Sequence, residues 1–142
     1  MKITLRHTLV AACLAIASAA SFAAEAIKVV YHVNGGLEQA SDAMRNIRNH
    51  LTADPGAKIV VVTHSSGINF LLEGAKDKNG SPYDAMVDDL VLKGIEFRVC
   101  NITLTSRNID RKLIHPEAKI VPSGVAEVSR LQAREGFVYL KP

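Results

Sequence analysis

The sequence contains no tryptophan, and aromatic residues make up only 5% of its 142 residues. So few aromatic side chains argue against the stacking platforms with which proteins bind single-stranded nucleic acids. With only five prolines and nine glycines, the chain is neither collagen-like nor dominated by linkers. Hydrophobic residues account for 48% of the chain and charged residues for 22%, which is typical of a globular protein. This length and composition predict a single folded domain.

The apolar run at residues 9–20 is too short to cross a bilayer as a permanent helix, but its surroundings match a secretory signal peptide. Lys2 and Arg6 precede the run without any acidic residue. Small residues follow it at the positions that signal peptidase recognises, so cleavage is predicted after Ala23. No twin arginine is present, which favours the general export route and a periplasmic location.

Cleavage after Ala23 changes what the charge and the cysteines indicate. Removing 23 of 142 residues leaves 119, with 15 basic and 14 acidic residues and a net charge of +1 in place of +3. A nucleic-acid partner is then not expected, and neither is a membrane once the signal is removed. Cys13 is also removed, which leaves Cys100 without a partner cysteine. Cleavage before Cys13, as in a lipoprotein, is the alternative, although only four apolar residues precede that cysteine.

Residues 24–142 alternate between β-branched runs and amphipathic runs. The β-branched runs predict strands at residues 27–33, 58–63, 95–100, 118–121 and 137–140. Apolar residues at helical spacing predict helices at residues 37–51, 69–76, 81–93, 104–113 and 123–136. Ser81 is expected to cap its helix, with Pro82 at the first helical position. This alternation predicts one α/β domain, a three-layer α/β/α sandwich with helices on both faces of a mainly parallel five-stranded sheet.

Polar and reactive residues follow three of the predicted strands. His32 and Asn34 mark the end of the first strand, His64 follows the second, and Cys100 and Asn101 end the third. Ligand sites in parallel sheets lie beyond the carboxyl ends of the strands. We therefore expect these residues at one edge of the sheet. His32, Asn34, His64 and Asn101 are the predicted ligand-binding residues.

Short motifs that would identify a catalytic class are missing at these strand ends. The turn at residues 34–36 lacks the glycine spacing of a nucleotide-binding loop and predicts only a tight turn with positive φ. Residues 65–67 do not form the G-x-S-x-G motif of a nucleophile elbow. His32, His64 and Cys100 could supply two nitrogen ligands and one sulfur ligand to a metal. No H-x-x-x-H or C-x-x-C pair supports that set, so the sequence predicts neither a metal nor a cofactor.

Cys100 offers the most specific chemistry in the chain. Strand alternation places Glu96, Arg98 and Cys100 on one face, away from the apolar face of Phe97 and its neighbours. The cationic Arg98 would stabilise a Cys100 thiolate, as would the N–H groups of a helix beginning just after it. A thiolate of lowered pKa can accept sulfur as a persulfide or form a mixed disulfide. The alternative is that Cys100 is a small buried hydrophobic residue, the usual fate of a free cysteine.

Three stretches of the chain resemble the DsrE/DsrF-like family, in its branch of small single-domain proteins. They are KVVYHVN near the start, LVLKGIEFRVCNITL in the middle, and VPSGVAEVSRLQAREGFVYLKP at the end. The last stretch is the most specific, with its Gly-Val and Leu-Gln pairs, its Gly-aromatic-x-Tyr and its Lys-Pro terminus. Together the stretches cover most of residues 24–142 in the right order.

The resemblance implies a DsrE/F-like sandwich of flavodoxin-like architecture and a homo-oligomer, commonly a dimer, trimer or hexamer. Family members in sulfur oxidation and tRNA thiolation carry sulfur as a persulfide on a cysteine after the corresponding strand, and Cys100 in FRVCN matches that position. Those members work in the cytoplasm with partner subunits, whereas the signal peptide predicts export. An oxidising periplasm would change the available sulfur donors and acceptors.

The sequence therefore predicts a periplasmic sulfur-handling protein that carries sulfane sulfur on Cys100, with Arg98 as thiolate stabiliser. It would be at most a sulfurtransferase-like enzyme, working with a sulfur donor or acceptor protein. The alternative function is a non-catalytic oligomeric module that binds a metal or small ligand at the edge formed by His32, His64 and Cys100. A third reading is a structural or partner-binding protein in which Cys100 is merely buried.

Overall fold

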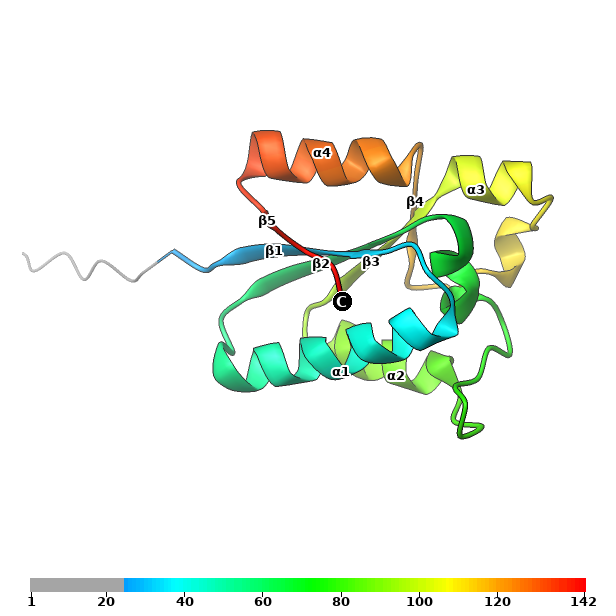
Figure 1. Cartoon of the computed structure of the whole chain (residues 1–142), viewed down its shortest axis with the longest axis horizontal. Coiled ribbons are helices and arrows are strands. Elements are labelled where there is room, and N and C mark those ends of the chain that lie inside the picture. Colours follow the sequence, from blue (N-terminus) through cyan, green and yellow to red (C-terminus); the bar gives the residue numbers. More distant parts are fainter. Residues whose placement is uncertain (1–24) are drawn as a thin grey trace, which may run out of the picture.

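The computed structural model describes residues 25–142 (Figure 1). The predicted signal peptide and Cys13 lie outside the described residues. The elements follow the predicted alternation of strands and helices: β1 (Lys28–Val33), α1 (Leu37–Ala53), β2 (Lys58–Thr63), η1 (Ser65–Leu71), α2 (Tyr83–Leu92), β3 (Glu96–Cys100), α3 (Asn101–Ser106), η2 (Arg111–Leu113), β4 (Lys119–Val121), α4 (Gly124–Glu135) and β5 (Val138–Leu140).

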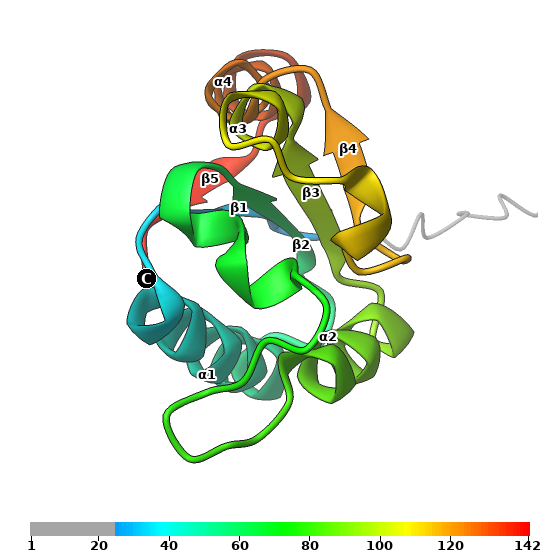
Figure 2. The ribbon, with the colours of Figure 1, turned by 90° about the vertical axis from the view of Figure 1, so that its right-hand side faces the viewer.

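The five strands form one sheet in the order β4-β3-β2-β1-β5, and every neighbouring pair is parallel. Helices α1 and α2 lie on one face, and α3 and α4 lie toward the other (Figures 1 and 2). The predicted three-layer α/β fold is therefore confirmed. Among residues 25–142, no helix is long and apolar enough to cross a membrane.

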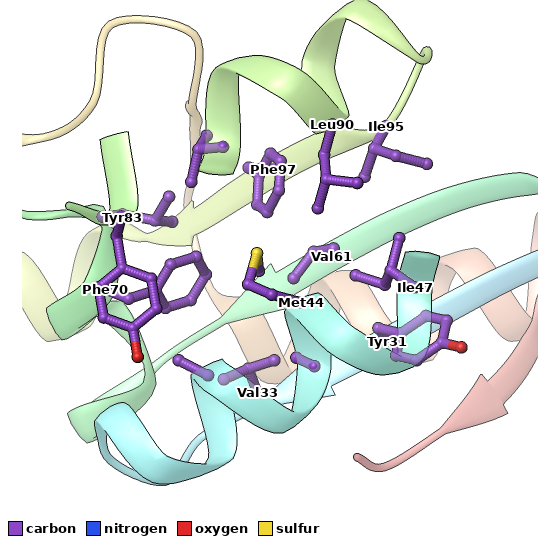
Figure 3. Close-up of a cluster of buried hydrophobic side chains, with 14 of the residues drawn as sticks. Tyr31, Val33, Met44, Ile47, Val61, Phe70, Tyr83, Leu90, Ile95 and Phe97 are labelled. Carbon is purple, nitrogen blue, oxygen red and sulfur yellow. The ribbon is translucent and has the colours of Figure 1, made fainter. Parts of the chain in front are cut away.

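The face covered by α1, α2 and η1 holds the main hydrophobic core (Figure 3). Met44 and Ile47 repeat at helical spacing on α1 and are fully buried against the sheet. Phe70, Tyr83 and Phe97 pack as a row of rings with centroid separations of 5.7 and 6.1 Å. The buried Tyr83 hydroxyl donates to the carbonyl of Leu37 at 2.7 Å, so it is satisfied although the residue has no exposed surface.

The opposite face has a smaller core under α4. Its buried members are Val30, Val60, Val62, Val128, Leu131 and Phe137. Ser123 caps α4 as its N-terminal position predicts, because its hydroxyl accepts from the Ala126 N–H at 3.3 Å. Gly136 ends α4 in the left-handed conformation, with φ of 73°.

Three local predictions were wrong. The helix expected at residues 69–76 is a 3-10 helix that lies earlier, over Ser65–Leu71. The irregular helix expected at 104–113 is two short elements, α3 and η2. Ser81 does not cap α2, since Pro82 occupies the cap position, and the Ser81 N–H instead donates to Asp77 Oδ1 at 2.8 Å. Asp77 thus stabilises the loop before α2. The spacing of apolar residues carries no information about such a side-chain contact within a loop.

Candidate functional site

The carboxyl ends of β1, β2 and β3 meet at one edge of the sheet, as parallel strands require. The strand order reverses at β1, since β2, β3 and β4 follow on one side of it and β5 returns on the other. Ligands in open α/β sheets bind at such a reversal point. His32 lies on β1 itself, and its neighbour across the reversal is Tyr139 on β5.

The structure brings His32 and His64 into direct contact. Their Nε2 atoms are 2.7 Å apart, and their ring centroids are separated by 4.8 Å. His32 follows Val30 on the α4 face of β1, and His64 follows Val62 on the same face of β2, so each ring lies where the small core ends. The pKa of His32 is lowered by burial and then by the charges of His64 and Lys141, and burial lowers that of His64. Both rings are therefore biased toward the neutral form.

Two hydroxyl groups hold the outer nitrogens of this histidine pair. The Tyr139 hydroxyl lies 2.9 Å from His32 Nδ1, and Ser65 Oγ lies 2.9 Å from His64 Nδ1. Sequence reasoning missed both residues. Tyr139 could have been found only from the pairing of β5 with β1, which strand periodicity does not specify. Ser65 has an unusual backbone conformation. Its φ is 51°, and it is one of two described non-glycine residues with positive φ.

Cys100 ends β3 beside this pair and is 4% exposed. Burial raises the pKa of its thiol, but hydrogen bonds outweigh burial and lower the pKa overall. The donors are the backbone N–H groups of Gly124, Thr103 and Ile102 and the Thr103 hydroxyl. Three of these four groups belong to the turn that begins α3. The sequence had predicted that N–H groups of a helix just after Cys100 would stabilise its thiolate, and this is where those donors lie.

Gly124 allows α4 to approach the strand ends. A Cβ at this position would lie 3.0 Å from the carbonyl oxygen of Thr63, 3.1 Å from His64 Cβ and 3.2 Å from Cys100 Cβ. These distances are tighter than ordinary van der Waals contact. The first residue of α4 therefore lies between the ends of β2 and β3, where its N–H helps to lower the pKa of Cys100.

Arg98 lies on the same face as Cys100, but its guanidinium binds carboxylates. Nη1 donates to Glu127 Oε1, and Nη2 donates to Glu96 Oε2 at 3.0 Å. The groups that lower the Cys100 pKa do not include Arg98. The source of thiolate stabilisation in the structure is thus the backbone and Thr103.

The other two predicted ligand-binding residues are engaged in local contacts. Asn101 Oδ1 accepts from Arg111 Nη2 at 2.6 Å. The backbone N–H groups of Asn34 and Gly35 both donate to Gln39 Oε1, at 2.9 and 2.5 Å. Neither Gly35 nor Gly36 has positive φ, so the predicted reason for the glycines in this turn was wrong. A Cβ on Gly35 would lie 2.9 Å from Gln39 Oε1, so the Gln39 side chain would have to shift to make room for it.

The metal set of His32, His64 and Cys100, which the sequence leaves as an alternative, does not form among the described residues. Within residues 25–142, no group of three or more histidine, cysteine, aspartate or glutamate side chains is placed to hold a metal ion. His32 and His64 converge, whereas the Cys100 sulfur faces the N–H groups of α3 and α4.

Substitution of Thr103 with valine is expected to raise the pKa of Cys100, because the variant lacks the hydroxyl that donates to the thiolate. A smaller thiolate fraction at neutral pH should slow alkylation, and the pH dependence of that rate measures the pKa. Thr105→Val, on an exposed position of the same helix, is the matched control. Thr103→Ser should retain the wild-type pKa. An unchanged pKa in Thr103→Val would assign the effect to the backbone donors alone.

Comparisons with known proteins agree with this architecture. The sequence model of the DsrE/DsrF-like family matches residues 7–142. A protein of unknown function, MTH1491 from Methanobacterium thermoautotrophicum, is 28% identical with a TM-score of 0.72, covering 82% of this chain and 99% of that one. The ychN protein from E. coli has a TM-score of 0.68, and the match also covers 82% of this chain and 99% of that one. At 16% sequence identity, this match shows a similar fold and nothing more. No curated protein sequence gives a significant match.

Proposed function

This chain belongs to the DsrE/DsrF-like family, and on that basis we propose that it is a periplasmic sulfur-handling protein that carries sulfane sulfur as a persulfide on Cys100. The observation that supports this most directly is the environment of Cys100. The sulfur lies at the carboxyl edge of the sheet, and four hydrogen-bond donors lower its pKa in spite of burial. A thiolate held in this way is both a nucleophile and a stable leaving group, and a sulfur carrier needs both properties.

The transfer step is a thiol–disulfide type of exchange. The Cys100 thiolate attacks the terminal sulfane sulfur of a polysulfide or persulfide donor. The new S–S bond forms on Cys100 as the S–S bond within the donor breaks, and the electron pair of that bond leaves with the shortened donor as a thiolate. No external oxidant is needed, because the sulfane sulfur keeps its oxidation level. The reverse exchange with an acceptor thiolate returns Cys100 to the thiolate.

The small exposure of Cys100 limits the donor. At 4% exposed, the residue offers its sulfur only a narrow approach at the rim of the sheet. A linear inorganic polysulfide fits such an approach better than a bulky aromatic disulfide does. We therefore expect inorganic polysulfide to be the better donor in solution.

The decisive measurement is the intact mass of the protein after treatment with polysulfide and removal of excess reagent. The wild-type protein is expected to gain the mass of one sulfur atom, and reduction by a thiol should remove it. Cys100→Ser should gain nothing, and its circular dichroism spectrum provides the control for folding. Absence of the adduct on wild type, or its survival in Cys100→Ser, contradicts the proposal and favours a buried structural cysteine.

The exposed edge strand supports a homo-oligomer as a further part of the proposal. Within residues 25–142, β5 has only one neighbour in the sheet, and Val138 and Leu140 on it are 55% and 37% exposed. Apolar side chains on an unpaired edge favour contact with a second copy. Sedimentation equilibrium should give a dimer, trimer or hexamer, and Val138→Lys should shift it toward the monomer. A monomeric wild type contradicts the oligomer without affecting the sulfur chemistry.

A further inference from the structure

The histidine pair of β1 and β2 has a geometry that the sulfur chemistry does not use. His32 Nε2 and His64 Nε2 face each other at 2.7 Å, and both side chains are partly exposed at the rim of the sheet. Two neutral imidazoles make such a contact only if one Nε2 carries a proton and donates it to the other. Without that proton, the two Nε2 lone pairs face each other across the gap.

The outer nitrogens have the partners that metal-binding histidines usually have. Ligating histidines commonly donate the second ring N–H to a fixed oxygen, which sets the tautomer and the direction of the ring. Tyr139 and Ser65 place hydroxyl oxygens 2.9 Å from the two Nδ1 atoms. When both Nδ1–H groups donate to these oxygens, both Nε2 atoms are free to bind one ion. Burial favours the neutral imidazole at both positions, which is the form that binds metals.

The separation of the two nitrogens discriminates between metal geometries. With metal–nitrogen bonds of about 2.05 Å, two ligands at right angles lie about 2.9 Å apart, and two tetrahedral ligands about 3.3 Å apart. The observed 2.7 Å is nearer to the right-angle case, but the rings meet almost head-on, with centroids 4.8 Å apart, so both must turn before their lone pairs meet on one ion. Tetragonal ions such as Cu²⁺ and Ni²⁺ therefore require less separation of the two nitrogens than tetrahedral Zn²⁺ does.

We propose that His32 Nε2 and His64 Nε2 form a two-histidine site for a tetragonal divalent ion, with Cu²⁺ bound more strongly than Ni²⁺. The order follows the general affinity series of nitrogen ligands for these ions. Water fills the remaining positions, because no third histidine, cysteine or carboxylate among residues 25–142 completes the set. The bound ion is therefore exchangeable. This site is independent of the proposed sulfur function, since Cys100 is not one of its ligands.

The test uses untagged protein carrying Cys100→Ser, which prevents Cu²⁺ from oxidising the thiolate. Titration with Cu²⁺, followed by electron paramagnetic resonance, should show one saturable tetragonal centre with hyperfine coupling to two imidazole nitrogens. Calorimetry with Ni²⁺, which does not oxidise thiols, should give one equivalent in the wild-type protein and in Cys100→Ser alike. A spectrum with no imidazole nitrogen, or no saturable binding, overturns the proposal and leaves the pair as a proton-bridged contact.

Variants locate the site. His32→Gln and His64→Gln should each weaken binding by at least about tenfold, and Tyr139→Phe by a smaller factor through loss of ring orientation. His50→Gln is the matched control, because His50 Nδ1 also contacts a tyrosine hydroxyl, that of Tyr31 at 3.0 Å, but lies outside the pair. Affinity retained in both His32→Gln and His64→Gln contradicts the assignment. The nitrogen coupling of Cys100→Ser, in which both histidines are present, decides the matter should either histidine variant fail to fold.

Discussion

Gly67→Ala is expected to destabilise the protein by at least about 3 kcal/mol, because the new methyl group would overlap backbone rather than side chain. A Cβ on Gly67 would lie 2.0 Å from the carbonyl oxygen of Val33 and 2.8 Å from Asn34 Cα. η1 rests directly on the end of β1 at this point, and no rotamer change can relieve the contact. Denaturant unfolding measures the effect as a lower midpoint with an unchanged slope.

Gly36→Ala is the matched control for this prediction. Gly36 is also a glycine at the end of β1, but a Cβ there would meet nothing within 4 Å, and its φ of −77° suits any residue. The free energy of unfolding of Gly36→Ala should differ from that of the wild-type protein by less than about 1 kcal/mol. Equal unfolding midpoints for Gly67→Ala and wild type would show that η1 can move away from β1 without loss, contrary to the packing described above.

Glu127→Gln is expected to destabilise the protein by about 2–3 kcal/mol at neutral pH. The variant leaves the guanidinium groups of Arg98 and Arg130 without the carboxylate that they share. Glu127 accepts from Arg130 Nε and Nη2 at 2.9 and 2.8 Å and also from Arg98. The Glu127 side chain is only 10% exposed and that of Arg98 only 15%. The network therefore joins α4 to β3 where the small core under α4 does not reach.

The pH dependence of this stabilisation has a definite sign. Hydrogen bonds from Arg130 and then from Arg98 outweigh burial and lower the pKa of Glu127 from 4.5 to about 2. The folded protein thus binds this proton less readily than the unfolded chain does. The stabilisation is fully present above pH 4.5 and is lost as the pH falls toward 2, with a total of about 3 kcal/mol.

Unfolding free energies measured from neutral pH down to about pH 2 test this directly. The wild-type protein and Glu127→Gln should differ most at neutral pH and converge in acid. Glu117→Gln, at an exposed position with no ion pair among the described residues, should follow the wild type throughout. A difference between wild type and Glu127→Gln that stays constant with pH would mean that packing, not charge, is responsible.

The strands could be predicted from the sequence because burial on both faces requires β-branched runs, and β2 shows this most clearly. Local patterns failed where tertiary contact decides the conformation. The segment at 65–71 forms a 3-10 helix in which Gly67 lies against β1, and that contact has no signature in hydrophobic spacing. Strand order was also beyond sequence reasoning, since a three-residue strand such as β5 carries no preference for its neighbour.

The candidate site was predictable in part for the same reason. His32, His64 and Cys100 follow buried strands, and parallel strands bring their carboxyl ends to one edge. Tyr139 reaches that edge only through the pairing of β5 with β1, which local sequence does not encode. The ion pairs of Arg98 likewise depend on Glu127 from α4. Residues on predicted strands were thus identified, and residues supplied by tertiary packing were missed.

The pairing of the last strand with the first affects how folding proceeds. Tyr139 of β5 and His32 of β1 are 107 positions apart, so their contact is among the most non-local in the chain. Such pairings form slowly, because a long loop must close before any contact is gained. The rest of the sheet, from β1 to β4, consists of strands that pair in chain order. A chain emerging N-terminus first therefore keeps one side of its first strand open until β5 arrives.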